Sequence, residues 1–386
     1  MKRFPIQRSR LAELARDAHL SVAGVARPDV FERARDFTIE HVNDGHMAGM
    51  DWFTTERARE AADPRTLQSG VRSILAVAVP FWSGDVEPPD DGILRGRIAR
   101  YAWGRDYHRV LKKRMKHLVT LLEEELGCEI DNRTLVDTAR VFDRAVAERA
   151  GVGWYGKNTM IIVPGHGSWA MLAEIYLDFP LEADLPLNRD CGRCTICIDK
   201  CPTGAITEPY RIHAPRCISY LTIEERGAIP REIRPLMGQW VFGCDVCQEV
   251  CPYTRAAKIQ PDPDFEPATI DNVYPSLELL ATMDDKQYLD LFAGTAVTRA
   301  KRRGLARNAA IALGNSGSTD AYPILRRMLY EHDEPLARQH AAWGLQHLAP
   351  GLARADLAAA RGNESDPSVT EEIDWAIEQC AEAGKA

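Results

Sequence analysis

Apolar and polar positions along the first half of the chain predict a mixture of strands and helices. The nearly continuous apolar stretches VRSILAVAV at 71–79 and SWAMLAEIYL at 168–177 predict buried strands, because a strand covered on both faces has few polar positions. Apolar residues at helical spacing after Tyr107 predict a long amphipathic helix that ends at Gly127. Between these elements, the segment 134–164 predicts a strand, a turn, a helix, a loop and a second strand.

From about residue 286 to the end of the chain, apolar residues recur at helical spacing. The sequence AAIAL at 309–313 returns 32 residues later as AAWGL at 341–345. Repeats of about this length are typical of stacked helical pairs, so we expect a HEAT-like array, with an ordinary alanine-rich pair of helices as the alternative. A proline-punctuated stretch, QPDPDFEP at 260–267, predicts a linker before this region.

These patterns predict an α+β fold with three consecutive domains. Residues 1–185 are expected to form an N-terminal α/β domain, residues 186–258 a cysteine-rich module, and residues 259–386 the linker and the helical domain. The longest apolar run, 74–82, has nine residues and contains a proline, whereas a membrane helix needs about 20. The first 20 residues lack an apolar signal core and predict an amphipathic surface helix, so we expect a cytoplasmic protein without a membrane partner.

Cysteine is the residue type whose distribution is most unusual. The chain has ten cysteines, and eight of them fall between Cys191 and Cys251, while Cys128 and Cys380 receive no role. Because the cytosol keeps thiols reduced, clustered cysteines there indicate a metal site rather than disulfides. The net charge of −8, from 48 basic and 56 acidic residues, gives no general attraction to nucleic acid, so any nucleic-acid surface has to be local.

The cysteine spacing is that of ferredoxin-like iron–sulfur proteins. CGRCTICIDKCP at 191–202 follows the C-x2-C-x2-C-x3-C-P pattern that holds 4Fe–4S clusters, and CDVCQEVCP at 244–252 is a second, interrupted copy whose missing ligand Cys217 can supply. Two zinc sites are the alternative, although these usually pair two C-x2-C units. Spacing alone leaves the pairing open. The expected ligand sets are Cys191, Cys194, Cys197 and Cys251 for one 4Fe–4S cluster, and Cys217, Cys244, Cys247 and Cys201 for the other.

Three features of the N-terminal region allow more than one interpretation. GVGWYG at 151–156 matches a dinucleotide-binding fingerprint by letter, but a predicted helix precedes it, so we interpret its glycines as the end of that helix and a turn. Asp137 follows a predicted strand, at a position where an acidic residue often caps the next helix. The aromatic residues of RYAWGRDYH at 100–108 are compatible with a simple hydrophobic core that has a polar rim.

Taken together, the motifs of this chain resemble the epoxyqueuosine reductase family, cobalamin-dependent iron–sulfur enzymes of queuosine synthesis in tRNA. The resemblance extends over almost the whole chain, and the second of its segments, standing before the cysteines, is the most specific. The segments are RYAWGRDYH at 100–108, VDTARVFDRAVAERAGVGWYGKNTMII at 136–162, CGRCTICIDKCPTGAI at 191–206, RCISYLTIE at 216–224 and GCDVCQEVCP at 243–252.

The resemblance implies a base-off cobalamin held between the N-terminal domain and the cluster module, and it implies that Asp137 is the proton donor. Opening an epoxide and releasing its oxygen needs an acid, and an ordinary aspartate is ionised at neutral pH. We therefore expect burial against the apolar corrin to raise the pKa of Asp137. The other residues implied at the cobalamin site are Arg100, Tyr101, Lys157, Asn158, Ile161, Ser219 and Asp245.

The resemblance also implies a tRNA substrate that carries epoxyqueuosine at the wobble position, an external electron donor and two-electron reduction of the epoxide to an alkene. A local basic run before the helical repeat could contact RNA phosphates, although a solvated helix face is an equal alternative. Two other functions remain open, a reductive dehalogenase-like corrinoid enzyme and a non-catalytic electron carrier, and we expect a monomer. The basic run consists of Arg299, Lys301, Arg302, Arg303 and Arg307.

Overall fold

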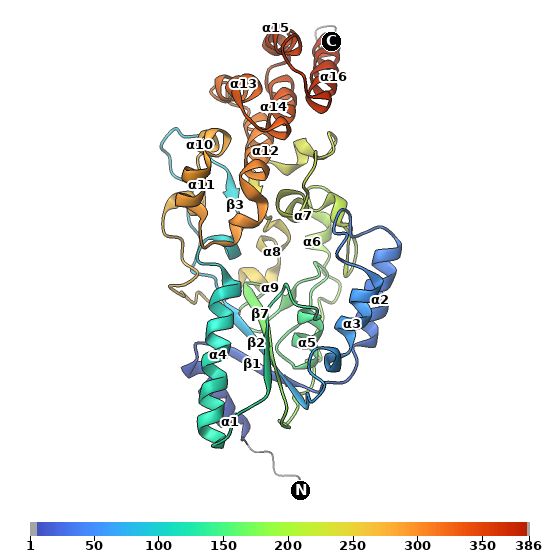
Figure 1. The fold of residues 1–386 in the computed structure, drawn as a ribbon, viewed down its shortest axis with the longest axis vertical. Coiled ribbons are helices and arrows are strands. Elements are labelled where there is room, and N and C mark those ends of the chain that lie inside the picture. Colours follow the sequence, from blue (N-terminus) through green and yellow to red (C-terminus); the bar gives the residue numbers. More distant parts are fainter. Residues whose placement is uncertain (1–5, 384–386) are drawn as a thin grey trace. The chain divides into compact units, whose positions relative to one another are not determined.

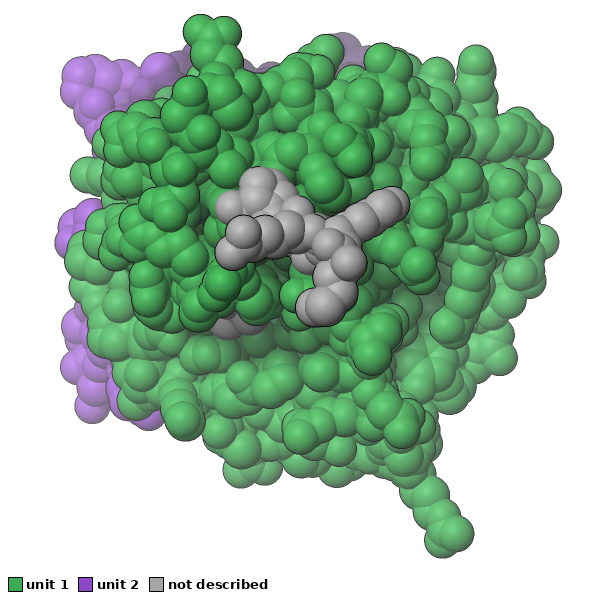
Figure 2. Space-filling view, turned by 90° about the horizontal axis from the view of Figure 1, so that it is seen from below, with its two compact units in different colours: residues 1–84, 105–215, 246–266 green, residues 85–104, 216–245, 267–386 purple. Residues whose placement is uncertain are grey.

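The computed structural model describes residues 6–383, and the chain forms two compact units (Figures 1 and 2). The three consecutive domains expected from the sequence do not coincide with these units, because each unit combines segments that are distant in the sequence. The start of the expected N-terminal helix, residues 1–5, lies outside the described residues. Unit 1 comprises residues 1–84, 105–215 and 246–266, and unit 2 comprises residues 85–104, 216–245 and 267–386.

A four-stranded antiparallel sheet forms the centre of unit 1, in the order β1-β2-β7-β4. All eight residues of β2 are buried, which confirms the buried strand predicted from the first apolar stretch, and β7 confirms the second. The register places Glu174 of β7 between Ala76 of β2 and Leu135 of β4, so an acidic side chain stands in the middle of the sheet. The strands are β1 (Val22–Ala26), β2 (Ser73–Pro80), β4 (Asn132–Leu135) and β7 (Ala170–Leu177).

Helices cover both faces of this sheet (Figure 1). Helices α1 and α4 lie on one face, and α5 packs against β1, β2 and β7 on the other. The long helix predicted after Tyr107 is confirmed as α4, and Asp106 caps it by accepting a hydrogen bond from the His108 N–H. Helix α5 is followed by its C-cap residue, Ala150, and then by Gly151, which has a φ of +67°. This confirms that the glycine stands at the end of a helix and does not open one. The helices are α1 (Arg8–Asp17), α2 (Glu32–Asn43), α3 (Thr55–Ala62), α4 (Tyr107–Leu126) and α5 (Asp143–Arg149).

Shorter elements complete unit 1 after the sheet. The strand pair β5 and β6 follows α5, and the cysteine-rich segment contributes only single-turn helices and one further strand pair. These elements are β5 (Trp154–Tyr155), β6 (Ile161–Ile162), α6 (Ile196–Asp199), β8 (Ile206–Glu208), β9 (Arg211–Ile212), α8 (Val246–Glu249) and α9 (Pro252–Arg255).

Unit 2 is mainly helical, with one short parallel strand pair, β3 and β10. The two copies of the sequence repeat lie on α12 and α14, whose backbones approach so closely that a Cβ atom on Gly314 would come 2.9 Å from the Cα of Gly344. Within residues 6–383, no helix combines the length with the apolar composition that a membrane crossing needs. The elements are β3 (Arg97–Ile98), α7 (Ile218–Ile223), β10 (Trp240–Phe242), α10 (Leu277–Thr282), α11 (Asp285–Phe292), α12 (Lys301–Gly314), α13 (Ala321–Glu331), α14 (Pro335–Leu348), α15 (Pro350–Arg361) and α16 (Pro367–Ala383).

Candidate functional site

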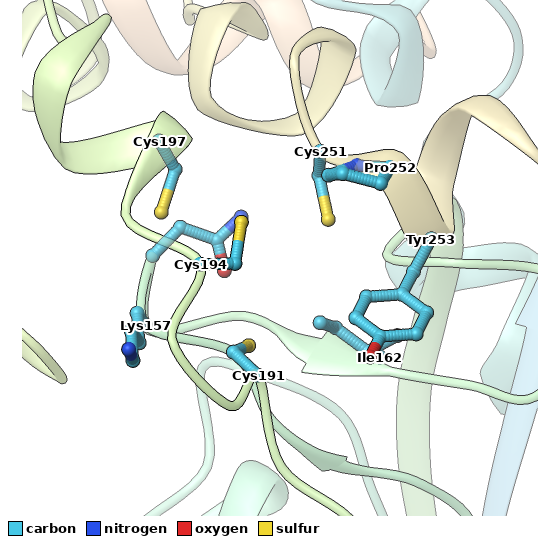
Figure 3. A pocket seen from close by; sticks show the side chains of 9 residues that line it. Lys157, Ile162, Cys191, Cys194, Cys197, Cys251, Pro252 and Tyr253 are labelled. Atoms are coloured by element: carbon cyan, nitrogen blue, oxygen red, sulfur yellow. The ribbon is translucent and has the colours of Figure 1, made fainter.

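Four cysteine side chains line one cavity in unit 1 (Figure 3). Three of them come from the segment that leads into and through α6, and the fourth, Cys251, directly precedes α9, where Pro252 occupies the first helical position. Their sulfur atoms point toward a common space, as the ligands of one cluster must. The four are those that the spacing grouped into the first ligand set, Cys191, Cys194, Cys197 and Cys251.

Two polar side chains beside the cavity hold the cysteine segments. Lys157 Nζ donates to the carbonyl oxygen of Gly192 (2.7 Å), and Asn158 Nδ2 donates to the carbonyl oxygen of Cys247 (3.2 Å). The Lys157 backbone N–H also donates to the Cys191 sulfur. Hydrogen bonds of this kind to cluster sulfurs tune reduction potential, so both residues fit a role beside a cluster.

The remaining candidates of the N-terminal region and the module are more dispersed. Ile161 is 4% exposed and packs into the apolar core around α5, while its neighbour Ile162 lines the cysteine cavity. The sulfur of Cys201 accepts a hydrogen bond from the Ala205 N–H (3.2 Å). The second ligand set stays a prediction from the spacing. Its members are Cys201 and Cys247 in unit 1 and Cys217 and Cys244 in unit 2, and outside both sets Cys128 is exposed and Cys380 is buried.

Asp137 lies in the loop between β4 and α5. The helix begins only at Asp143 with Phe142 at its N-cap, so the interpretation of Asp137 as a helix cap is wrong. Its Oδ2 instead accepts hydrogen bonds from the Tyr107 hydroxyl (2.7 Å) and from His108 Nε2 (3.2 Å), both at the start of α4. The Asp137 backbone has φ of +42° and its side chain is 59% exposed, so the loop presents an acidic group to solvent.

The protonation of this site differs from the expectation. Burial opposes ionisation of His108, but hydrogen bonds to Asp106 and Asp137 outweigh it and raise the pKa of His108 to about 9. Partial loss of hydration would raise the pKa of Asp137, but the hydrogen bonds from His108 and Tyr107 outweigh this effect and bring that pKa below its usual range. In this structure, therefore, the imidazolium carries the proton at neutral pH and Asp137 is ionised.

Sequence reasoning missed His108 and Tyr107 as partners of Asp137. Their motif was noticed for its aromatic residues, and the useful signal was the Asp106-Tyr107-His108 sequence at a helix start. Asp106 caps α4 and, through the same Oδ1, lies 2.8 Å from His108 Nδ1. When His108 is protonated, both ring nitrogens donate a hydrogen bond, Nδ1 to Asp106 and Nε2 to Asp137. These two bonds fix the orientation of the imidazole ring.

In unit 2, two of the candidate cobalamin residues, Arg100 and Asp245, meet directly after β3. The Arg100 N–H donates to Asp245 Oδ2 (2.7 Å), and Asp245 is 1% exposed. The Arg100 guanidinium pairs with Asp85 (2.8 Å) and stacks over Trp103. Of the two remaining candidates, Tyr101 packs partly buried against the helical core, and Ser219 lies in α7.

The basic run does not form one exposed surface. Arg307 is fully buried, which removes it from the candidate RNA contacts. Arg302 is 16% exposed and pairs with Asp285 and Asp333, and Arg299 pairs with Glu224. Lys301 and Arg303 are exposed at the start of α12.

Arg307 has a structural position that the sequence gave no signal for. Its guanidinium donates to three carbonyl oxygens in the 221–227 segment and to the Asn308 side chain. Asn308 Nδ2 in turn donates to the carbonyl oxygens of Thr222 (3.0 Å) and Val241 (2.8 Å). The pair thereby ties α7 to β10, and these two elements stand directly after Cys217 and shortly before Cys244.

Three family models match parts of this chain. A model described as "4Fe-4S double cluster binding domain" matches residues 190–254, "Epoxyqueuosine reductase QueG, DUF1730" matches residues 62–138, and "HEAT repeats" matches residues 277–378. The first supports iron–sulfur binding by the cysteine-rich segment. The third confirms the helical repeat that the AAIAL and AAWGL sequences predicted.

Whole-chain comparisons agree with these models. The chain is 38% identical over 344 residues to the epoxyqueuosine reductase of Xanthomonas campestris pv. campestris, covering 88% of this chain and 96% of the relative. It is 32% identical over 376 residues to that of Bacillus subtilis, covering 97% and 96%. An epoxyqueuosine reductase structure with an epoxyqueuosine-modified tRNA stem loop matches at TM-score 0.89 and 32% identity, covering 97% and 98%. A Bacillus subtilis structure whose catalytic aspartate loop is swung out of the active site matches at TM-score 0.88 and 32% identity, covering 96% and 98%.

Proposed function

Because this chain belongs to the epoxyqueuosine reductase family, we propose that it reduces the epoxide of epoxyqueuosine, at the wobble position of tRNA, to the alkene of queuosine. The reaction adds two electrons and two protons, and the epoxide oxygen leaves as water. The observation that carries the proposal is the exposed carboxylate of Asp137 beside a protonated imidazole, in the same unit as a cavity lined by four thiols. The carboxylate and the imidazole can supply protons, and the four thiols can hold an electron-carrying cluster.

The proton starts on His108 and reaches the departing oxygen through Asp137, which is ionised at rest and holds the proton only during the transfer. As the C–O bond breaks, the oxygen becomes an alkoxide, a far stronger base than either side chain. The proton can pass through Asp137 because its Oδ2 already accepts a hydrogen bond from His108 Nε2 at 3.2 Å. Tyr107 holds the same oxygen at 2.7 Å and so orients the carboxylate throughout.

The proposal includes two 4Fe–4S clusters and one cobalamin, which when bound would transfer electrons to the epoxide carbon. The donor set suits the carboxamide side chains of a corrin, since the candidate residues offer N–H and O–H donors together with carboxylate and amide acceptors. These residues would bind the corrin and fix its orientation. The residues that would hold the corrin are Arg100, Tyr101, Lys157, Asn158, Ile161, Ser219 and Asp245, with Asp137 facing the substrate.

For the RNA, Lys301 and Arg303 remain as phosphate contacts, because they are exposed and Arg307 is not. An external reductant is part of the proposal, since the two electrons have to enter from outside the chain. The enzyme is taken to act as a cytoplasmic monomer.

The test is anaerobic reconstitution with iron, sulfide and cobalamin, followed by an assay with a reduced dye on tRNA that contains epoxyqueuosine. The full-length chain should form queuosine, and Asp137→Asn should lose at least about 100-fold in rate, because an amide cannot take a proton from His108 and pass it to the departing oxygen. The iron–sulfur absorption spectrum should be unchanged in this variant. Asp131→Asn, which alters an exposed carboxylate just before β4, is the matched control and should keep the wild-type rate.

Three results would contradict the proposal. Full activity of Asp137→Asn would remove the assigned acid. Bound cobalamin without queuosine would point to a dehalogenase-like substrate, and clusters without bound cobalamin would leave an electron carrier.

A further inference from the structure

Two carboxyl groups, the buried one of Glu174 and the partly buried one of Asp143, are connected to the Asp137 loop. Glu174, in the middle of the sheet, is 1% exposed, and its side chain hydrogen-bonds with that of Asp143 at the start of α5. Asp143 Oδ1 in turn accepts a hydrogen bond from the Asp137 backbone N–H (3.1 Å). A continuous chain of contacts thus runs from the sheet to the residue that carries the exposed carboxylate.

Two carboxyl groups can hydrogen-bond only when one of them carries a proton. Burial raises the pKa of Glu174 well above its usual range, and the charge of Asp143 adds to the effect. Burial and the charge of Asp137 also raise the pKa of Asp143, to about 6. At neutral pH, Glu174 is therefore the neutral donor and Asp143 the ionised acceptor. The other titratable groups that influence the pair are Arg144, Tyr155 and Tyr176.

The pair is poorly explained as packing alone. Its neighbours on the α5 face of the sheet are apolar, and apart from Asp143 no hydrogen-bond partner of Glu174 Oε1 is found among the described residues. Such an arrangement costs stability, and a leucine would avoid the cost. The Asp137 backbone also needs a restraint, because its φ of +42° is unfavourable for a residue with a Cβ atom.

We propose that Asp143 and Glu174 are positioning residues that hold the Asp137 loop in the arrangement in which Asp137 meets Tyr107 and His108. Asp143 fixes the Asp137 N–H, and the Glu174 hydroxyl fixes the Asp143 carboxylate. The two residues directly after Asp137 are held separately, because Arg57 of α3 donates to the carbonyl oxygens of Thr138 and Ala139. This proposal rests on the proposed function only in taking Asp137 as the acid.

The first measurement is the titration of His108 by NMR, on the full-length chain labelled with 15N-histidine. His108 is the reporter because its pKa depends on contact with Asp137. In Asp143→Ala the loop is released, and the pKa of His108 should fall from about 9 toward its ordinary value, stopped short by Asp106. Asp143→Asn keeps an acceptor oxygen and should restore most of the wild-type value.

The second measurement is the rate of queuosine formation by the reconstituted enzyme. Asp143→Ala should lower kcat about tenfold with KM for the tRNA unchanged, since a lost hydrogen bond to a charged acceptor is worth about that factor. Glu174→Gln, which still donates to Asp143, should stay within about twofold of wild type, whereas Glu174→Leu should lose nearly as much as Asp143→Ala. Glu148→Gln, a partly buried carboxyl on the same helix α5, is the control and should change neither measurement.

The proposal is overturned if His108 in Asp143→Ala still titrates near 9 with kcat unchanged, or if Glu174→Gln and Glu174→Leu behave alike. Should Asp143→Ala fail to fold, the two Glu174 variants decide alone. A wild-type enzyme that makes no queuosine would refute the proposed function, while the His108 titration would still test the pair.

Discussion

Each of the two units buries an ionisable side chain, but the two side chains differ in charge and in the hydrogen bonds they make. In unit 2, the guanidinium of Arg307 is fully buried and makes four hydrogen bonds, three of them to backbone carbonyls. In unit 1, Glu174 is equally buried, yet it is neutral, and Asp143 is the hydrogen-bond partner that the described residues give it. A buried ionisable group whose hydrogen bonds are all made, such as Arg307, stabilises the fold. A buried group that lies close to an exposed acid, such as Glu174, can instead keep that acid in position for chemistry.

The largest expected effect tests whether the hydrogen bonds of Arg307 stabilise unit 2. Arg307→Met removes the cation and takes the donors away from three carbonyl oxygens, so the free energy of unfolding should fall by about 3–5 kcal/mol in urea titrations. Because the α7 segment near Cys217 is released, iron content after reconstitution should fall by about half. Lys301→Met, on the exposed start of the same helix, should stay within about 0.5 kcal/mol of wild type.

The next effect concerns the charge of His108. Its pKa is raised to about 9, so its contribution to stability is fully present below the unfolded pKa of 6.5 and is lost as pH rises through 9. Wild type should exceed His108→Gln by up to about 3 kcal/mol near pH 6, and the difference should vanish near pH 10. Denaturant titrations at several pH values measure it, and a difference that is constant with pH would show that His108 is neutral in the folded chain.

A smaller effect on thermal stability tests whether Glu174 is protonated in the folded chain. Glu174 is neutral when folded but ionised when unfolded at neutral pH, so its raised pKa lowers stability as pH rises. Glu174→Gln should therefore melt at a higher temperature than wild type at neutral pH, and the advantage should disappear on acidification below the ordinary pKa of a glutamate. A melting temperature that falls at neutral pH would mean that Glu174 is ionised and paired in the folded chain.

The smallest effect tests the exposed remainder of the basic run. The double variant Lys301→Ala, Arg303→Ala should weaken tRNA binding uniformly across tRNA sequences and reduce the slope of log affinity against log salt by about 1–2. Arg302→Ala is the comparison, because Arg302 is already paired with Asp285 and Asp333 and should leave the salt slope unchanged. Equal slopes in the double variant and wild type would exclude this surface.

The features that could be predicted from the sequence are those set by short-range patterns. The buried strands, the long helix after Tyr107, the helical repeat and the grouping of Cys191 to Cys197 all depend on neighbouring residues. The sequence could not reveal the burial of Arg307, because its carbonyl partners lie 80 to 86 positions away. Likewise, Asp137 meets Tyr107 and His108 across 30 and 29 positions, and its protonation follows from that contact.

The interleaving of the two units has a consequence for synthesis on the ribosome. β3 emerges early but pairs with β10, about 140 residues later, so at typical elongation rates it waits roughly 7 to 28 s for its partner. Cys251 is likewise made long after Cys191, and unit 1 lacks its last segment until residue 266 has emerged. The cavity lined by four thiols can thus be complete only after about two thirds of the chain has been made. A chain that stopped before Cys251 would therefore lack one of the four thiols that line this cavity.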